Sequence, residues 1–307
     1  MPTIHANGID IFYEQWGNPA DPALILVCGL GAQVVTWDDA FIQALVSRGY
    51  FVTSWDNRDV GLSTWFTAAG LPTPEGILGG TESAPYLLSD MAADAAAVVE
   101  GLKLGPVHVV GVSMGGMIAQ QFAIDFPALT RTLTSIMSTP AAMSVGAPTP
   151  EILGMMLTPR SADLATFLEE ELESWKKTSG DYEPNAAWVR RQAELSWARG
   201  RNPEGVMRQM AAIVQSPDRR PGLSTLTMPV LVMHGDADPL VTPSGGEATA
   251  GAVAHCRYVV FPGMGHSLPQ ELWSAVFDEI DAVTLQAEGA RVPSRPPDSN
   301  HARYMPA

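Results

Sequence analysis

The chain has 307 residues, 46% of them hydrophobic, and a formal net charge of −15. This length accommodates one large α/β domain with an insertion or two smaller domains, each with a full core. The acidic charge excludes nucleic acid as an expected partner, because binding to phosphates needs a basic face, and it also disfavours docking on anionic lipid.

Cysteine usage and the beginning of the chain give no sign of secretion or of metal binding. The two cysteines, Cys28 and Cys256, do not have the spacing of metal ligands, and Cys28 follows an apolar run, as a small buried residue would. No signal peptide is recognisable, and no apolar run reaches the roughly 18–20 residues that span a bilayer. We expect a cytoplasmic protein without metal or cofactor, and the oligomeric state stays open, a homo-oligomer included.

Short apolar runs rich in β-branched residues predict the first strands. Leu24–Val27 and Val107–Val110 are apolar or nearly so and are soon followed by glycine, as strands buried on both faces are. Two more strands are predicted at Tyr50–Trp55 and Leu133–Met137. An amino-terminal hairpin is expected to begin at about Ile9.

Helical patterns separate these strands. Ser89 is expected to cap a helix that runs to Leu102, with Asp90 in its first turn. Another helix is predicted from Met114 to Asp125, before a proline. The alternation of strands and helices predicts a mostly parallel sheet covered by helices on both faces.

Residues 139–220 differ from the rest because they contain helical segments and no convincing strand. Ser161 is expected to cap the segment around Leu164–Trp175, and Asn202-Pro203-Glu204 is a strong helix start. A helical insertion between two halves of one sheet predicts a lid. Its methionines either line a substrate pocket or join the lid to the core: Met143, Met155, Met156, Met207 and Met210.

The pattern of the first part returns after the insertion. Strands are predicted at Val230–Met233 and Tyr258–Phe261, followed by a helix whose apolar stripe runs from Leu272 to Val283 and which ends near Gly289. The expected domains are therefore an α/β core over residues 1–138 and 221–289, a helical lid over 139–220, and a tail over 290–307 outside the core.

Gly111-Val112-Ser113-Met114-Gly115 matches the G-x-S-x-G pattern. By chance alone, about one chain in ten of this length carries such a match. Here the motif directly follows a predicted strand and opens a predicted helix, which is the position of a nucleophile elbow. Ser113 is therefore the predicted nucleophile, and the alternative is a serine that caps an ordinary helix.

A serine hydroxyl needs a positioned base, and the base needs an acid. Of the six histidines, His266 is the best candidate, because it follows the last predicted strand in the glycine-rich segment Pro262–Gly265. Asp236 and Asp238 both follow the strand Val230–Met233. Asp238 is the predicted acid and Asp236 a turn residue, although position alone does not separate the two. The order Ser, Asp, His is that of α/β-hydrolases.

The oxyanion of an acyl-transfer reaction needs two hydrogen-bond donors. One is predicted to be the backbone N–H of Met114, next to the nucleophile. The other is predicted to be the backbone N–H of Leu30 in Cys28-Gly29-Leu30-Gly31-Ala32, where the flanking glycines let the backbone approach a substrate.

Taken together, these motifs resemble the α/β-hydrolase superfamily from about Ile9 to about Leu285. Within that superfamily, the chain resembles the aclacinomycin methylesterase and related actinobacterial esterases and lipases. Cys28 departs from the pattern, since many members have histidine before the oxyanion glycine. Five segments in the family's order carry the resemblance: Gly29–Gly31, Asp56–Ser63, Gly111–Gly115, His234–Pro239 and Gly263–His266. The resemblance implies a structural role for Asp56–Ser63.

The sequence thus predicts a serine hydrolase that cleaves small to medium apolar carboxylic esters through an acyl-enzyme intermediate. A C–C bond hydrolase, a thioesterase, a lactonase or a cofactor-free perhydrolase could use the same triad, because a fold does not fix its substrate. A binding protein without hydrolytic activity would not need an intact triad. Serine at the elbow, in place of aspartate, disfavours an epoxide hydrolase or a dehalogenase.

Overall fold

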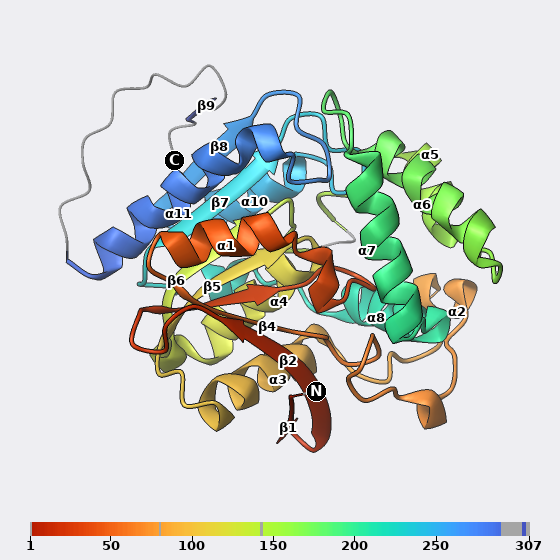
Figure 1. Cartoon of the computed structure of the whole chain (residues 1–307), viewed down its shortest axis with the longest axis horizontal. Helices are drawn as coiled ribbons and strands as arrows, with labels where there is room; N and C mark the ends of the chain where they lie inside the picture. Colours follow the sequence, from red (N-terminus) through yellow and green to blue (C-terminus); the bar gives the residue numbers. More distant parts are fainter. Residues whose placement is uncertain (1, 80, 142–143, 290–302, 305–307) are drawn as a thin grey trace.

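The computed structural model describes residues 2–79, 81–141, 144–289 and 303–304. Its centre is one sheet, and the described strands are β1 (Thr3–Ala6), β2 (Ile9–Trp16), β3 (Ala23–Val27), β4 (Phe51–Trp55), β5 (Val107–Val112), β6 (Thr130–Ile136), β7 (Val230–Gly235), β8 (Cys256–Phe261) and β9 (Arg303–Tyr304). Their order across the sheet is β1-β2-β4-β3-β5-β6-β7-β8-β9 (Figure 1). The strands from β4 to β8 pair in parallel, which confirms the predicted mostly parallel sheet.

Helices cover both faces of this sheet, as predicted. The described α-helices are α1 (Asp39–Ser47), α2 (Pro74–Leu78), α3 (Leu88–Gly101), α4 (Met114–Asp125), α5 (Pro150–Leu157), α6 (Leu164–Thr178), α7 (Ala186–Arg199), α8 (Pro203–Gln215), α9 (Arg220–Leu223), α10 (Ser244–Ala252) and α11 (Trp273–Ala287). Helices α3 and α4 pack in one apolar core, and α1 and α11 in another on the opposite face.

Alternation along β3 shows why the two cores lie on opposite faces. Ile25 and Val27 belong to the core beneath α3 and α4, whereas Leu24 and Leu26 belong to the core beneath α1 and α11. All four side chains are at most 1% exposed. Successive residues of a strand point to opposite faces, so a continuously apolar strand serves two cores at once.

The amino-terminal hairpin begins earlier than the sequence analysis expected. Strand β1 starts at Thr3, and its residue Ala6 pairs with Ile9 of β2. The two residues between the strands are Asn7 and Gly8, with φ angles of 51° and 77°. Asn-Gly is the usual pair for a two-residue turn that needs positive φ at both positions, and this signal was missed.

Two predicted helix caps were wrong, and a third is confirmed. Helix α3 is preceded by Leu87, whose N–H donates to the Asp90 carboxylate at 2.7 Å, so Ser89 lies inside the helix. Helix α6 is capped by Asp163, which stands directly before its first residue, whereas Ser161 lies too early in the chain. Helix α8 begins after Asn202, whose side chain accepts from the N–H of a residue in the first turn, as predicted.

Helices α5–α9 lie between β6 and β7 in the described part of the chain. Figure 1 shows α5, α6 and α7 grouped beyond one end of the sheet. We call α5–α8 the inserted helices. Helix α9 is left out of this group because it packs against α10 and α4 of the core. The predicted tail, residues 290–307, lies outside the described residues except for β9.

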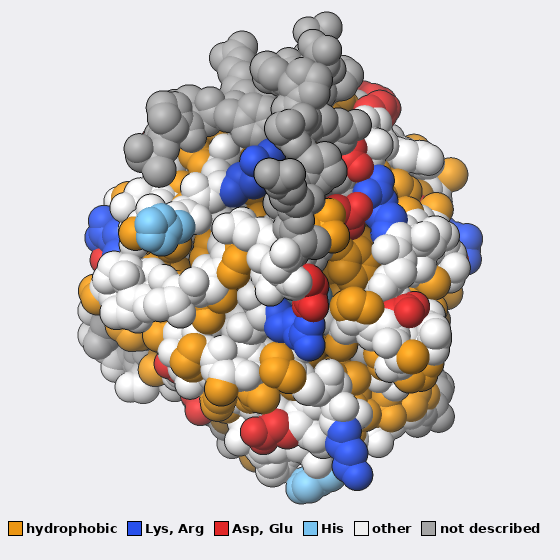
Figure 2. Space-filling view, turned by 90° about the vertical axis from the view of Figure 1, so that its left-hand side faces the viewer, with side chains coloured by type: hydrophobic (Ala, Val, Ile, Leu, Met, Phe, Trp, Pro, Cys, Tyr) orange, Lys and Arg blue, Asp and Glu red, His pale blue; other side chains and the backbone are white. Residues whose placement is uncertain are grey.

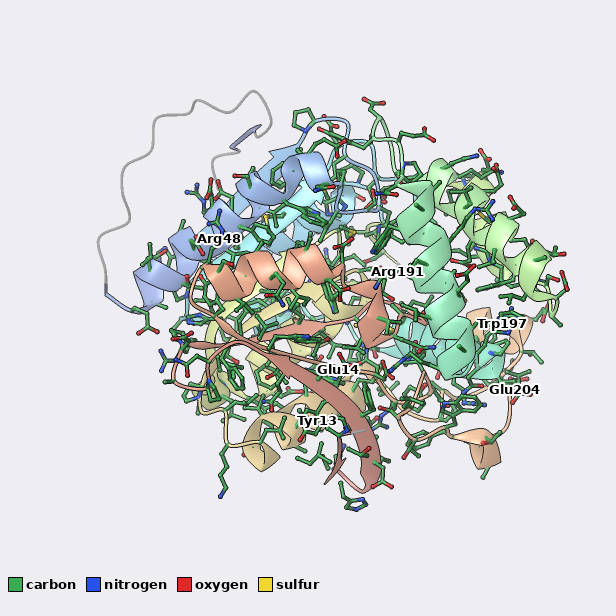
Figure 3. The ribbon with its side chains drawn as sticks, viewed as in Figure 1. Tyr13, Glu14, Arg48, Arg191, Trp197 and Glu204 are labelled. Atoms are coloured by element: carbon green, nitrogen blue, oxygen red, sulfur yellow. The ribbon has the colours of Figure 1, made fainter. Side chains whose placement is uncertain are left out.

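Charged side chains are dispersed over one face of the molecule (Figure 2). On the face in Figure 2, basic side chains lie apart from one another, with acidic and apolar side chains between them. Arg48, which follows α1, donates to Asp278 of α11 at 3.0 Å and so links the two helices of one layer (Figure 3).

No described helix has the length and apolar character that crossing a bilayer requires.

Candidate active site

Ser113 occupies the sharp turn between β5 and α4. Its φ and ψ are 56° and −123°, a backbone conformation that non-glycine residues rarely adopt. Its side chain makes no capping hydrogen bond to α4, so the alternative of an ordinary capping serine is wrong. Its N–H donates to the carbonyl of Ile136 at 3.0 Å, which ties the turn to the neighbouring strand β6.

Glycines on either side make this turn possible. A Cβ atom at Gly111 would lie 2.1 Å from the carbonyl oxygen of Gly115, and a Cβ atom at Gly115 would lie 2.0 Å from the carbonyl oxygen of Val27. Both contacts are with backbone atoms, which cannot move aside as a flexible side chain can. The two glycines of the motif are therefore steric requirements of the turn.

Gly115→Ala should lower the free energy of unfolding by about 3 kcal/mol or more, because the new methyl group overlaps the backbone of β3. Gly154→Ala in α5 is the matched control, since a Cβ atom there meets nothing within 4 Å. That control should gain about 0.5–1 kcal/mol from helix propensity. Urea unfolding of both variants checks this, and equal stabilities would contradict the close approach of α4 to β3.

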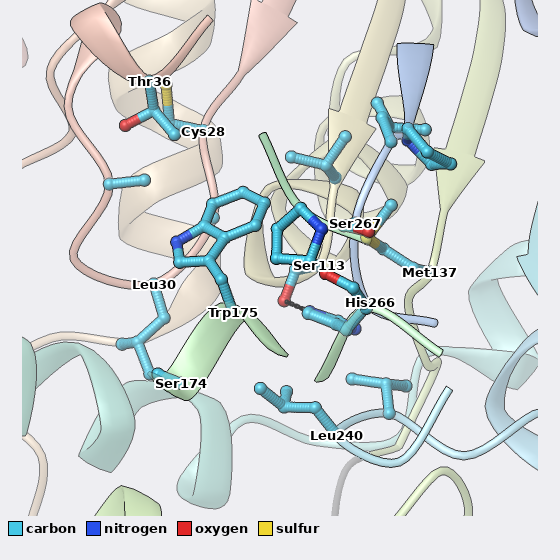
Figure 4. Close-up of a pocket in the computed structure, with 18 of the residues that line it drawn as sticks. Cys28, Leu30, Thr36, Ser113, Met137, Ser174, Trp175, Leu240, His266 and Ser267 are labelled. Atoms are coloured by element: carbon cyan, nitrogen blue, oxygen red, sulfur yellow. Dashed lines mark hydrogen bonds between the residues drawn. The ribbon is translucent and has the colours of Figure 1, made fainter. Parts of the chain in front are cut away.

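His266 lies between Ser113 and Asp238 and contacts both. Its Nε2 is 2.8 Å from the Ser113 Oγ (Figure 4), and its Nδ1 is 2.7 Å from the Asp238 Oδ2. The side chain of His266 is 10% exposed and that of Asp238 is fully buried. The structure therefore brings together the three predicted side chains, which belong to three separate loops. Such a series can remove the proton of a serine hydroxyl.

Asp238 is held by backbone as well as by histidine. Its Oδ1 accepts hydrogen bonds from the N–H groups of Leu240 at 2.9 Å and Val241 at 3.0 Å. Burial alone would raise the pKa of this carboxyl, but His266 and His234 beside it hold the pKa below its usual range. Asp238 is therefore a fixed anion that faces one nitrogen of His266.

The other aspartate of this loop has a different task. Asp236 accepts a hydrogen bond from the N–H of Gly263 at 2.6 Å and does not contact His266. It links the loop after β7 to the loop after β8. This turn role is the one that the sequence analysis assigned to it.

Two further histidines, His108 and His234, are buried structural residues. His108 Nδ1 lies 3.0 Å from the Thr132 hydroxyl, and burial together with the Arg131 cation lowers the pKa of His108 to about 4. His234 Nε2 lies 2.8 Å from the carbonyl oxygen of Val241. The N–H of the same residue donates to Asp238. His234 thus supports the loop of Asp238 and remains apart from Ser113.

Two backbone amides beside Ser113 are available to a ligand. Neither Leu30 nor Met114 donates its N–H to another described residue. Met114 is the first residue of α4, where helix amides lack internal partners and the helix dipole is positive. Gly29 lies against the nucleophile, since a Cβ atom there would be 3.4 Å from the Ser113 Cβ. These amides can stabilise an oxyanion that forms on a carbonyl bound at Ser113.

A cavity of about 580 Å³ opens at Ser113 and His266. It is mostly apolar and is lined by several aromatic rings, among them Trp175, which is drawn with Ser113 in Figure 4. Met155 and Met156 line this cavity, and Met207 and Met210 line an adjoining cavity of about 600 Å³. Met143 lies outside the described residues. The inserted helices thus supply much of the cavity wall. The described residues contain no cluster of side chains suited to hold a metal ion.

The end of helix α6 supports the loop of His266, and the sequence analysis missed this contact. The N–H of His266 donates to the carbonyl of Thr178 at 2.6 Å, and the N–H of Gly265 donates to that of Ser179 at 3.1 Å. Gly180 fits closely here, since a Cβ atom would lie 2.4 Å from the carbonyl oxygen of Gly263. Backbone hydrogen bonds between distant segments leave no side-chain motif in the sequence. The only trace of this contact in the sequence is the glycines that its close packing requires.

The segment Asp56–Ser63 joins the core to the inserted helices. Asp56 accepts from the N–H of Val34 at 2.7 Å and pairs with Arg199 of α7 at 2.5 Å. Asp59 pairs with Arg208 of α8 at 2.9 Å, with both side chains fully buried. Asp56 and Asp59 therefore have structural roles, and neither contacts Ser113 or His266.

Comparison with known proteins places the chain among hydrolases. A family model described as the alpha/beta hydrolase fold matches residues 22–270. The chain is 30% identical to rhodomycin D methylesterase of Streptomyces peucetius over 94% of this chain and 99% of that protein. It is 26% identical to 3-oxoadipate enol-lactonase 2 of Acinetobacter baylyi over 82% of this chain and 85% of that protein.

Among solved structures, the enol-lactonase of Burkholderia xenovorans LB400 is similar in fold. Its TM-score is 0.71, with 21% sequence identity, and the match covers 91% of this chain and 100% of that one. This likeness concerns the arrangement of the sheet and helices.

Proposed function

The chain belongs to the α/β-hydrolase fold family, and from this membership we propose that it is a carboxylic ester hydrolase with Ser113 as nucleophile. His266 is the general base and Asp238 the acid that orients it. The observation that carries the proposal is the unbroken series of hydrogen bonds from Asp238 through His266 to Ser113.

The proposed reaction has two halves. Ser113 Oγ adds to the ester carbonyl while His266 Nε2 takes its proton, and the amides of Leu30 and Met114 stabilise the oxyanion. The imidazolium then protonates the leaving alcohol, which departs and leaves an acyl group on Ser113. Water, activated by the same histidine, releases the acid and restores the serine. Asp238 remains ionised throughout and stabilises the imidazolium.

The proposed substrate is a small-molecule ester with an apolar acyl group. The cavity of about 580 Å³ lies in the usual range for sites that bury a small ligand. Its indole rings favour flat apolar groups over charged ones. The relative from Streptomyces peucetius is named a methylesterase, which supports a small alcohol as the leaving group.

We also propose that the inserted helices act as a lid. Trp175 of α6 and Met155 and Met156 of α5 line the cavity at Ser113. With these helices in place, the reacting carbonyl is shielded from water, which strengthens the oxyanion contacts.

Hydrolysis of p-nitrophenyl esters from acetate to laurate tests the proposal. We expect turnover that varies with chain length, with a burst of p-nitrophenol before the steady state where release of the acid is slow. An organophosphonate should inactivate the enzyme, and peptide mapping should place the adduct on Ser113. An adduct on another residue, or activity that survives complete labelling of Ser113, would refute the assignment.

Opening of a lactone is the second candidate function, and the Acinetobacter relative named an enol-lactonase supports it. The same groups would serve, but the alcohol would remain joined to the acyl group. Relative kcat/KM values for a methyl ester and a lactone of matched size separate the two functions.

A further inference from the structure

The loop that carries the Leu30 amide is held from two sides. On the core side, Asp56 accepts from the N–H of Val34 at 2.7 Å, and the Asn57 amide donates to the carbonyl of Cys28 at 3.1 Å. On the other side, the N–H of Gly31 donates to the Gln209 side chain at 2.9 Å. The two core contacts hold the ends of the loop, whereas Gln209 holds its middle, next to Leu30.

Gln209 uses both ends of its amide. Its Oε1 accepts from Gly31, and its Nε2 donates to the carbonyl of Arg58 at 2.8 Å. The side chain is on α8, one of the inserted helices, and the residue is 0% exposed. The hydrogen bond to Arg58 is buried and the one to Gly31 is part-buried, so removal of the side-chain amide leaves a buried carbonyl and a partly shielded N–H without these partners.

Helix α8 also touches the loop directly at this point. Gly31 has a φ of 68°, and a Cβ atom there would lie 2.9 Å from a methyl group of Val206. The N–H of Ala32 donates to the carbonyl of Gly29 at 3.2 Å, which closes a tight turn around Leu30 and Gly31. The turn is thus enclosed between α8 and the elbow at Ser113, against which Gly29 lies.

We propose that Gln209 is a positioning residue for the oxyanion hole: its hydrogen bond to Gly31 holds the adjacent Leu30 amide at the reacting carbonyl. The inference rests on the proposed function, in which Leu30 is an oxyanion donor. Without Gln209, the part-buried N–H of Gly31 loses its acceptor and the turn is free to shift. A displacement of about 1 Å at a reacting centre can cost about 100-fold in rate. Loss of one oxyanion donor costs about 10²–10³.

The same helix contains a matched control. Gln215 of α8 also bridges two backbone groups: its Oε1 accepts from the N–H of Ala84 at 2.7 Å, and its Nε2 donates to the carbonyl of Glu82. These partners lie outside the oxyanion loop and outside the cavity at Ser113. Gln215→Met therefore removes the same kind of contact from the same helix without touching the turn around Leu30.

The experiment compares Gln209→Met and Gln215→Met in the full-length enzyme. For a p-nitrophenyl ester, Gln209→Met should lower kcat by about 10- to 100-fold with little change in KM. The rate constant for inactivation by an organophosphonate, whose tetrahedral adduct occupies the oxyanion site, should fall in parallel. Gln215→Met should leave both rate constants unchanged, and thermal unfolding should show that both variants are folded.

Two outcomes would overturn the inference: wild-type kcat in Gln209→Met, or an equal loss of kcat in Gln215→Met. If Gln209→Met does not fold, Gln209→Asn replaces it, because the shorter amide cannot reach both partners, and wild-type kcat in that variant is again contradictory. Failure of the proposed function is distinguishable, because it would appear as activity that survives Ser113→Ala.

Discussion

Replacement of Ser113 by alanine should lower kcat for ester hydrolysis by about 10⁴-fold or more, while the protein stays folded. The hydroxyl is the only atom group removed, and His266 Nε2, which lies 2.8 Å from it, then has no proton to accept. Steady-state hydrolysis of the best p-nitrophenyl ester, with enzyme concentration raised for the mutant, measures the loss. Activity within tenfold of wild type would show that another group carries the reaction.

Ser113→Gly gives this prediction a second readout. The φ of 56° and ψ of −123° at Ser113 form a strained combination for a residue with a side chain, at a cost of about 1–3 kcal/mol. Glycine adopts positive φ readily. Ser113→Gly should therefore be as inactive as Ser113→Ala but unfold at a higher temperature. A glycine variant less stable than the alanine variant would contradict strain at the elbow.

Asp238→Asn should lower kcat by about 10³- to 10⁴-fold. The amide keeps the shape of the carboxyl, but its oxygen must stay on the N–H groups of Leu240 and Val241, so its NH2 group faces the Nδ1 of His266. An N–H donor at this position selects the wrong tautomer, and a neutral group does not stabilise the imidazolium. Asp236→Asn is the matched control, because Asp236 bonds to the N–H of Gly263 and not to His266. Similar losses in the two variants would contradict the assignment of Asp238 as the orienting acid.

The depressed pKa of Asp238 also has a consequence for stability. Its folded-state pKa lies below the ordinary 3.8, so the carboxylate contributes stability that is present above pH 3.8 and is lost as pH falls through the folded pKa. The difference in unfolding free energy between wild type and Asp238→Asn should therefore shrink as the pH falls from about 4 to about 2. Urea unfolding across that range measures it, and a difference that grows with acid would reverse the sign of the linkage.

Local patterns were enough to predict most of the framework. The apolar runs predicted β3, β5, β7 and β8 because a strand buried on both faces has no polar alternation. The elbow was predictable because a strand, a tight turn and a helix follow one another within a dozen residues. The capping errors at Ser89 and Ser161 arose where a neighbouring aspartate, Asp90 or Asp163, competed for the same helix start.

The candidate site was only partly accessible from sequence. Ser113 and His266 each follow the carboxyl end of a predicted strand. Because parallel strands end at the same edge of a sheet, their meeting at that edge could be inferred from the sequence. Asp236 and Asp238 are two residues apart in one loop, and position gave no decisive reason to prefer either. The fold separates them, because Asp238 points to His266 and Asp236 to the N–H of Gly263.

What only the tertiary structure decided are contacts between segments far apart in the chain. Gln209 meets Gly31 across 178 residues, and the end of α6 meets the loop of His266 through backbone carbonyls that no side-chain motif announces. Hydrophobic periodicity and turn-forming residues are local properties, so they can be recognised in the sequence. The partner of a buried amide or carbonyl is set by how the inserted helices pack against the sheet, and that packing is a property of the whole chain.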